Sequence, residues 1–361
     1  MNSTLHIIGS GIAGLTTALA LSSRFRKIIL YEKDKSPCNF SSRKNAAIAR
    51  SYEHDPLLSM LAKRSLMLYF EREKKCGPLV EKTGLLVEPL ERDYYDADFL
   101  IKHPGYEGLT SVDKTLEFNG CVLSGSYVKD NGYFYLDRVL SDFLQQVEKT
   151  GADVQTECRV QDFALENGLV KSFIVKRKHS EEMIQVEPGD LVVNAAGSWA
   201  HSLQSSTSST LSALIPHKRH IYRISGTPGN AQIPVIWSER NDIYLRRDEN
   251  NDLVITHCDE RPASFDDYSV NPGEKANFLQ ALKNRFSDLH ERPILEERAC
   301  LRTFSLDDLP VLGFDPRVKN LFYVAGLGGR GLSIAMALVE EIRKAYDTPE
   351  SKSAFAAGRF Y

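Results

Sequence analysis

A glycine-rich turn near the start of the chain constrains the fold more than any other feature. The strand-like residues Leu5, Ile7 and Ile8 are followed by Gly9, Gly11 and Gly14 in the order GxGxxG, and residues 12–21 carry apolar side chains at helical spacing. The first glycine permits a tight turn, the second lets a pyrophosphate approach the backbone, and the third lets the helix pack closely on the strand. This order predicts a strand, turn and helix that bind a dinucleotide.

The residues after the turn narrow the choice of dinucleotide only in part. A second strand is predicted at residues 27–31, and Glu32 follows it. Glu32 lies close to the offset of about 20 residues at which an acid binds the ribose in such folds. An acid there disfavours NADP, whose additional phosphate prefers an arginine. NAD and FAD remain equally compatible, because both present an ADP half to the turn.

A second glycine turn at the other end of the chain favours FAD. Residues 321–346 read as a strand, a turn that contains Gly326, Gly328, Gly329 and Gly331, and a helix. A helix N-terminus offers unpaired N–H groups to an electron-rich group such as a flavin. Two such turns at opposite ends of the chain indicate a cofactor long enough to contact both.

The alternation of strands and helices is interrupted after the second strand and resumes with a predicted helix at residues 136–149. We therefore expect an α/β fold in which a doubly wound, Rossmann-like FAD-binding domain of glutathione-reductase type is interleaved with a substrate-binding domain on a mixed or antiparallel sheet. The serine-rich residues 202–212 read as a loop between domains. The predicted bounds are 1–78, 132–204 and 298–346 for the FAD-binding domain, 79–131 and 205–297 for the substrate-binding domain, and 347–361 for a loosely held C-terminal extension.

Composition excludes several classes of protein. A net charge of -3 without a dense basic run argues against a nucleic-acid partner. The six cysteines form no CxxC pair, which argues against a zinc site or a disulfide framework and favours a reducing cytoplasm. The first apolar run is broken by glycines and follows no cation, unlike a signal peptide. No window reaches the roughly 18 apolar residues of a membrane span, so contact with a quinone pool would be peripheral.

Seven segments, in order along the chain, carry a resemblance to a known family. They are IIGSGIAGL, SSRKNAAIA, LVVNAAGSWA, PHKRHIY, IYLRRD, LRTF and LFYVAGLGGRGLS. Over residues 5 to 346 the chain resembles the DAO-type family of FAD-dependent oxidoreductases, which includes glycine oxidases and D-amino acid dehydrogenases, and within it the D-arginine dehydrogenases. The resemblance implies FAD contacts at Gly9, Gly11, Ile12, Ala13, Gly14, Glu32, Lys33, Ser41, Ser42, Lys44, Asn45, Ala46, Val160, Ala196, Gly197, Gly328, Gly329, Arg330, Gly331 and Leu332.

The resemblance also implies a substrate site and no metal. Arg219 and Arg302 match arginines that hold a carboxylate, for which the planar guanidinium fork is suited. Tyr244 matches a tyrosine that helps to close the site, and Arg330 belongs to the turn over the flavin. We expect Arg246 and Arg247, which lie just after Tyr244 in the sequence, to be solvated surface charges.

The implied reaction oxidises the C–N bond of an amino acid or of a secondary amine carboxylate. Hydride passes from the α-carbon to flavin N5, and the resulting imine is hydrolysed to a 2-oxo acid. One alternative is an FAD-dependent dehydrogenase or oxidase of a 2-hydroxy acid similar to 2-hydroxyglutarate. Another is a flavin-binding subunit without turnover of its own. The substrate side chain, its stereochemistry, the electron acceptor and the oligomeric state stay open.

Two positions depart from the pattern. Ile48 replaces an active-site histidine of the D-arginine dehydrogenases, which argues against a cationic D-amino acid as the substrate. Cys300, with Thr303, matches the CxxT arrangement in which monomeric sarcosine oxidases bond their flavin. Because buried free cysteines are common, we expect a buried thiol and non-covalent FAD, with a covalent link at Cys300 as the minor alternative.

Overall fold

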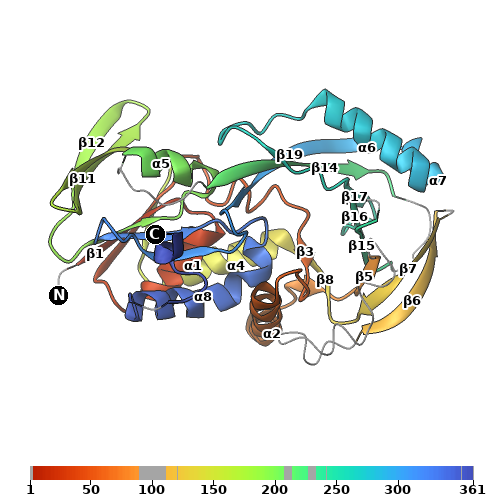
Figure 1. Ribbon diagram of the computed structural model, residues 1–361, viewed down its shortest axis with the longest axis horizontal. Helices are drawn as coiled ribbons and strands as arrows, with labels where there is room; N and C mark the ends of the chain where they lie inside the picture. Colours follow the sequence, from red (N-terminus) through yellow and green to blue (C-terminus); the bar gives the residue numbers. More distant parts are fainter. Residues whose placement is uncertain are drawn as a thin grey trace.

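The computed structural model describes residues 3–88, 111–119, 121–206, 214–226, 233–240, 242–350 and 352–360. These residues form an elongated molecule in which two larger sheets lie towards opposite ends, joined across the middle (Figure 1). No helix in the described ranges is both long and apolar enough to cross a membrane.

The first sheet has six strands, and the N-terminal glycine turn follows the carboxyl end of one of its inner strands. All neighbouring strands are parallel except the first pair in the order, which is antiparallel. Most side chains of the central strands are buried on both faces, as expected for a covered parallel sheet. In sheet order the strands are β20 (Val311–Phe314), β21 (Leu321–Ala325), β13 (Leu191–Asn194), β1 (Thr4–Ile8), β2 (Lys27–Tyr31) and β9 (Asp153–Gln155).

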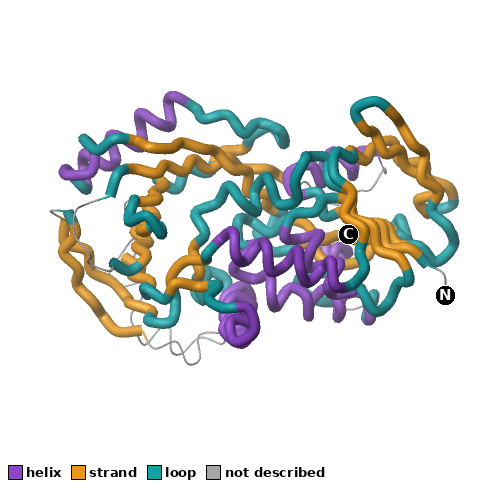
Figure 2. The backbone as a smooth tube through the Cα atoms, turned by 180° about the vertical axis from the view of Figure 1, so that it is seen from behind, coloured by secondary structure: helices purple, strands orange, loops and turns teal. Residues whose placement is uncertain are grey.

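Different layers cover the two faces of this sheet. Four helices pack on one face, where they stack together in the middle of the molecule (Figure 2). A three-stranded antiparallel sheet packs on the other face. The helices are α1 (Ile12–Leu21), α2 (Pro56–Cys76), α4 (Leu136–Lys149) and α8 (Gly331–Asp347), and the three strands are β10 (Arg159–Glu166), β11 (Leu169–Arg177) and β12 (Ser180–Gln185).

The second large sheet has nine strands and is mixed, because β5 and β15 pair in parallel while the other pairs are antiparallel. Buried side chains of two helices pack on it. Its strands are β5 (Leu85–Glu88), β6 (Ser111–Phe118), β7 (Cys121–Val128), β14 (Ile215–Ile224), β15 (Val235–Ser238), β16 (Ile243–Arg247), β17 (Leu253–Thr256), β18 (Arg261–Pro262) and β19 (Ile294–Phe304), and its helices are α6 (Pro272–Arg285) and α7 (Ser287–His290).

Short elements complete the described fold. They are the three-stranded sheet of β3 (Ile48–Ala49), β8 (Gly132–Phe134) and β4 (Val80–Glu81), the helix α5 (Ala200–Ser206), and the 3₁₀ turns η1 (Gly197–Trp199) and η2 (Ala357–Phe360).

Strands β14 and β19 form a long antiparallel pair that runs from the middle of the molecule into the half that holds α6 (Figure 1). In this pair Arg219 lies opposite Cys300, and His217 lies opposite Arg302. The chain passes from β19 to β20, which belongs to the six-stranded sheet. The carboxyl end of β19 therefore lies where the two large sheets meet.

The structure confirms the predicted fold class, with its glycine turn, its parallel sheet and its second, mixed sheet. Helices α1 and α4 have the predicted bounds. The division into domains at the bounds given above stays a prediction. Of the serine-rich segment predicted as a loop, residues 202–206 belong to α5 instead, and residues 207–212 lie outside the described residues.

The C-terminal extension is held more firmly than expected. Phe355 and Ala357 are buried, and the N–H of Leu312 donates to the Phe355 carbonyl at 2.8 Å. Arg359 donates to both carboxylate oxygens of Asp307, at 2.7 and 2.9 Å. The expectation of a loose tail is therefore wrong for residues 355–359, because apolar side chains in this segment fill space beside β20.

Candidate active site

One large cavity collects most of the predicted site residues. Its volume is ≈ 380 Å³, and it is bordered by residues of both large sheets. Three predicted residues, Gly14, Lys44 and Arg330, do not line it. Those that do are Gly9, Gly11, Ile12, Ala13, Glu32, Lys33, Ser41, Ser42, Asn45, Ala46, Val160, Ala196, Gly197, Arg219, Tyr244, Arg302, Gly328, Gly329, Gly331 and Leu332.

One end of the cavity is formed by the N-terminus of α1. Gly11 is its N-cap and has no side chain that could cap the helix. A Cβ added at Gly14 would lie 2.0 Å from the Gly9 carbonyl oxygen, so a glycine is required for the helix to approach the strand this closely. Glu32 accepts hydrogen bonds from the backbone N–H and the hydroxyl of Ser10, at 3.1 and 2.7 Å. The Ser42 hydroxyl accepts from the Ile12 N–H at 3.0 Å, so this serine lies at the helix N-terminus, where a phosphate is favoured.

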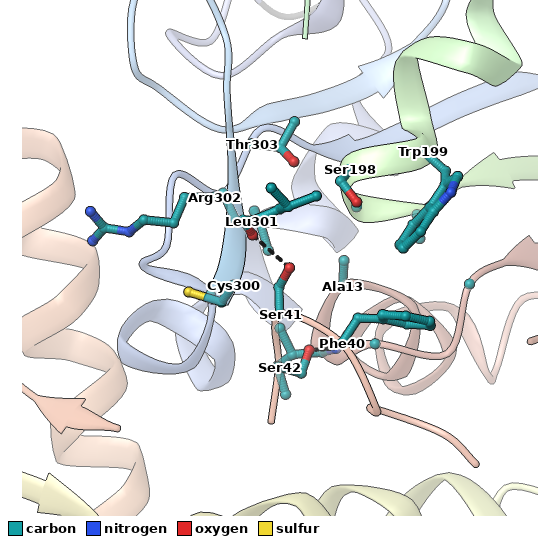
Figure 3. Close-up of a pocket in the computed structure, with 18 of the residues that line it drawn as sticks. Ala13, Phe40, Ser41, Ser42, Ser198, Trp199, Cys300, Leu301, Arg302 and Thr303 are labelled. Carbon is teal, nitrogen blue, oxygen red and sulfur yellow. Dashed lines mark hydrogen bonds between the residues drawn. The ribbon is translucent and has the colours of Figure 1, made fainter. Parts of the chain in front are cut away.

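Aromatic residues form the wall beside this end. Phe40 and Trp199 come from different segments and lie close together in the cavity (Figure 3), with ring centroids 4.8 Å apart. The Lys33 ammonium lies 3.5 Å from the Trp199 ring centroid and 4.0 Å from that of Phe40. Burial lowers the pKa of Lys33. Neither aromatic residue was predicted from the sequence, although Trp199 lies two residues after Gly197, which was predicted to contact FAD.

The N-terminus of α8 borders the cavity beside that of α1, since a Cβ added at Gly331 would lie 2.9 Å from Cγ2 of Ile12. A Cβ at Gly329 would lie 2.1 Å from Nε of Arg302, and the residue has a φ of +75°, so the turn admits the arginine only because a glycine is there. Arg330, the N-cap residue, turns away from the cavity. Its Nε donates to Oε2 of Glu53 at 3.1 Å. The expectation that the Arg330 side chain belongs to the site is not supported by this placement.

The two helix N-termini together fit FAD. Both border a single cavity, and a helix N-terminus favours an anionic or electron-rich group such as a pyrophosphate or a flavin. The cavity lining also includes small residues such as Ala13, Ala46 and Ala196. Small residues and helix N-termini in one cavity suit a dinucleotide cofactor.

Two arginines and a tyrosine meet near the α8 end. Nη1 of Arg302 lies 2.8 Å, and Nη2 of Arg219 3.5 Å, from the same oxygen, Oε1 of Glu260. Burial, together with the charge of Arg219, lowers the pKa of Arg302. Burial acts in the same direction on Arg219, but Cys258 and Glu260 outweigh it and the pKa is raised. Burial raises the pKa of Tyr244 to about 12, so its hydroxyl stays protonated at neutral pH.

A buried polar chain stands behind Arg219. The Asp259 carbonyl accepts from Nε of Arg219 at 2.8 Å, and the Asp259 carboxylate accepts from the His220 backbone at 2.9 Å. His257 lies between Asp259 and Glu274, with one ring nitrogen 3.9 Å from the first carboxylate and the other 3.1 Å from the second. The 3.9 Å contact is too long for a hydrogen bond, so the connection from Arg219 runs through Asp259 to His220, whose Nδ1 lies 2.7 Å from the Asp259 carboxylate.

Arg50 places a third guanidinium in the cavity wall, and the sequence alone did not predict it. Its Nη1 donates to the Tyr244 hydroxyl at 2.5 Å, and its Nε and Nη2 donate to both oxygens of Glu53 at 2.7 and 2.8 Å. Ile48, two residues earlier, lines the same cavity. The two-residue period of a strand could therefore have identified Arg50 from Ile48.

Arg246 corrects another expectation. It is 8% exposed rather than solvated, and its Nε donates to the Ala46 carbonyl at 2.6 Å. Burial lowers its pKa to about 10. Since β16 is covered on both faces, a charged residue in it must find backbone partners inside the protein. Arg247, the next residue, is half-buried rather than fully solvated.

Cys300 lies on the same strand as Arg302 and points to the same side (Figure 3). The thiol is buried and lines the cavity, and burial raises its pKa. On the other side of this strand the Leu301 carbonyl accepts a hydrogen bond from the Ser41 hydroxyl at 2.6 Å (Figure 3). Whether Cys300 forms a covalent bond with a flavin stays a prediction.

Solved structures share this fold. The chain is similar to L-proline dehydrogenase from P. horikoshii, with a TM-score of 0.82 and 19% identity over 99% of this chain and 98% of that one. It is also similar to glycine oxidase from Bacillus cereus ATCC 14579, with a TM-score of 0.76 and 20% identity over 97% and 99% of the two chains. At these identities the likeness establishes the fold alone.

Comparison of sequences extends the likeness. The mouse mitochondrial pyruvate dehydrogenase phosphatase regulatory subunit is 22% identical in an alignment that covers 91% of this chain and 39% of the mouse protein. The chain thus spans 39% of the length of this relative and 41% of the length of a second curated relative. The model of the FAD dependent oxidoreductase (DAO) family matches residues 5–344. The resemblance to D-arginine dehydrogenases in particular stays a prediction, but the chain belongs to the DAO family of FAD-dependent oxidoreductases.

Proposed function

We propose that the protein oxidises the C–N bond of an amino acid or a secondary amine carboxylate, with Arg219 and Arg302 holding the substrate carboxylate. The arginine pair would also hold the carboxylate of a 2-hydroxy acid, so the choice of an amine rests on the similar structures. The names of similar structures, glycine oxidase and L-proline dehydrogenase, describe proteins that act on amino acids, which supports the proposal.

The observation that carries the proposal is the shared position of Glu260. One oxygen of this carboxylate lies within 3.5 Å of both guanidiniums, so the two arginines converge on a point that a substrate carboxylate fits. The Glu260 side chain is 36% exposed, whereas those of Arg219 and Arg302 are 7% and 16% exposed. A substrate carboxylate can therefore replace Glu260, whose side chain then turns towards solvent.

The chain's own residues orient the substrate. Arg302 touches the glycine turn at the start of α8, and a carboxylate held there places the α-carbon beside the proposed flavin end. The Tyr244 hydroxyl accepts from Arg50 and keeps its own proton to donate to the substrate. FAD, when bound, accepts the hydride that leaves the α-carbon as the nitrogen lone pair forms the C=N bond.

The proposal is tested by mixing the FAD-loaded protein, without oxygen, with D- and L-amino acids, N-methylglycine and 2-hydroxy acids. Bleaching of the flavin absorbance by amines, with release of a 2-oxo acid after hydrolysis, is the expected result. Bleaching by hydroxy acids alone would overturn it in favour of a 2-hydroxy acid dehydrogenase or oxidase. Reoxidation by air, compared with reoxidation by quinone analogues, then identifies the electron acceptor.

A second candidate is a flavin-binding chain without turnover. The likeness to a mouse protein named as a regulatory subunit favours it. In that case none of these compounds bleaches the flavin of the isolated protein, while addition of a co-purifying partner restores turnover. The same panel therefore separates the two candidates.

A further inference from the structure

The arginine end of the cavity has an unusual charge distribution. Arg50, Arg219 and Arg302 all line it. Within the described part of the chain, the acidic residues that line the cavity are Glu32, which follows β2, and Asp162, in β10. Both belong to the segments of the expected nucleotide end. A cationic substrate side chain would therefore meet three guanidiniums in the lining here, and no carboxylate of the lining.

Each of two carboxylates near the arginine end forms ion pairs with two arginines. Glu53 pairs with Arg50 and also with Arg330, and Glu260 pairs with Arg219 and also with Arg302. Each group of three carries one more positive than negative charge. The Glu53 side chain is 1% exposed and fixed, whereas the Glu260 side chain is 36% exposed and can leave. When Glu260 turns away, the end of the cavity gains further positive character.

Arg50 offers a second position for an anion. Its bonds to Glu53 and Tyr244 use three of the five N–H groups of a guanidinium, one on each nitrogen. The Cζ atoms of Arg50 and Arg219 lie 5.7 and 6.0 Å from the Tyr244 ring centroid. The Arg219 and Arg302 position and the Arg50 position are thus both adjacent to Tyr244, within reach of one small molecule.

We propose that the substrate is a dicarboxylate. One carboxylate binds between Arg219 and Arg302, and the second binds to Arg50 and the Tyr244 hydroxyl. This inference rests on the proposed function, since it names the class of amine that the same site takes. It opposes the cationic substrates that a resemblance to D-arginine dehydrogenases implies, because the described lining of this end has no carboxylate to bind them.

Matched substrates test the inference in the FAD-loaded protein. Glutamate is compared with glutamine, and iminodiacetate with N-methylglycine, so that each pair differs mainly in the second carboxylate; arginine represents cationic side chains. The expected result is that kcat/KM for anaerobic flavin reduction is about tenfold or more higher for each diacid, since a charge-assisted hydrogen bond is lost with the second carboxylate. Equal rates for diacid and partner, or faster reduction by arginine, would overturn it.

Variants assign the preference to Arg50. Arg50→Gln alone would remove one cation paired with Glu53, so the double variant Arg50→Gln with Glu53→Gln keeps the net charge of the group. It should reduce the preference for diacids to within about threefold. A purely structural role for Arg50 would lower the rates for both members of each pair equally. Arg223→Gln, on β14 but outside the cavity lining, is the control and should keep the preference.

A binding measurement separates failure of this inference from failure of the proposed function. Glutarate and butyrate carry no amine, and their affinity is measured by calorimetry without turnover. Tighter binding of glutarate by about tenfold, lost in the double variant, supports the second anion position. If no amine bleaches the flavin but glutarate is still preferred, the proposed reaction is wrong and the diacid site stands. If amines bleach it without preference and glutarate binds no better than butyrate, only the diacid inference is wrong.

Discussion

Individual side chains decide what this cavity can hold. Arg219 is buried and Arg302 is partly buried, and both are ion-paired with a carboxylate at the edge of the site. Buried guanidiniums need such partners, because an unpaired buried charge is costly. The arrangement keeps the arginines ready for an incoming carboxylate without leaving them unpaired beforehand.

The variant Arg302→Gln tests whether Arg302 binds the substrate carboxylate. Its guanidinium is the closer of the two to Glu260 and touches the last glycine turn. We expect kcat/KM to fall about 100-fold, mostly through a higher KM, because one charged hydrogen-bonding partner of the carboxylate is lost. The FAD content should be unchanged, and Arg302→Lys should recover only part of the activity, since an ammonium lacks the planar fork. Unchanged KM in Arg302→Gln, with Arg223→Gln as the control, would contradict the assignment.

Tyr244→Phe tests the role of the buried hydroxyl. Because the pKa of Tyr244 is raised to about 12, the hydroxyl remains protonated and neutral at every pH well below that value. We expect kcat/KM to fall about tenfold through the lost hydrogen bond, with no change in the shape of its pH profile between pH 6 and 10, ~2 units below that pKa. Loss of a limb of the profile in the variant would show that Tyr244 titrates in this range.

The helices and strands place these side chains from distant parts of the chain. The α1 turn requires contact between Gly14 and the Gly9 carbonyl, and the β14–β19 pair carries both arginines that we propose to hold the substrate carboxylate. Gly14→Ala should push α1 away from β1, lower stability by roughly 1–3 kcal/mol and reduce FAD occupancy. Thermal unfolding and the ratio of flavin to protein absorbance measure both effects. Gly358→Ala is the control, since no atom lies within 4 Å of its added Cβ; equal behaviour of the two variants would contradict the packing argument.

The sequence was sufficient for local elements but not for contacts between distant ones. The GxGxxG turn, α1 and β2 could be predicted because strand period, helix period and glycine spacing are local properties. The Arg50–Tyr244 hydrogen bond joins residues 194 positions apart, and Arg330 meets Glu53 across 277 positions. No periodicity records such pairs. Arg246 was misjudged for the same reason, because burial of both faces of β16 depends on the whole sheet.

The molecule as a whole brings the two ends of the chain to one cavity. Glycine turns at residues 9–14 and 326–331 border it, although more than 300 residues of sequence separate them. The six-stranded sheet supplies the turns, and the nine-stranded sheet supplies Arg219, Tyr244 and Arg302. The residues proposed to bind the nucleotide and the substrate therefore lie on different sheets that meet at the cavity, in agreement with binding sites elsewhere that form where layers or domains adjoin.

The central claim is that Arg219 and Arg302 hold the substrate carboxylate in place of Glu260. A crystal structure of the FAD-loaded protein soaked with glutarate tests it most directly. We predict one glutarate carboxylate within hydrogen-bond distance of both guanidiniums, with the Glu260 side chain turned towards solvent. Glutarate bound elsewhere, with Glu260 still between the two arginines at the distances of 2.8 and 3.5 Å found here, would contradict it.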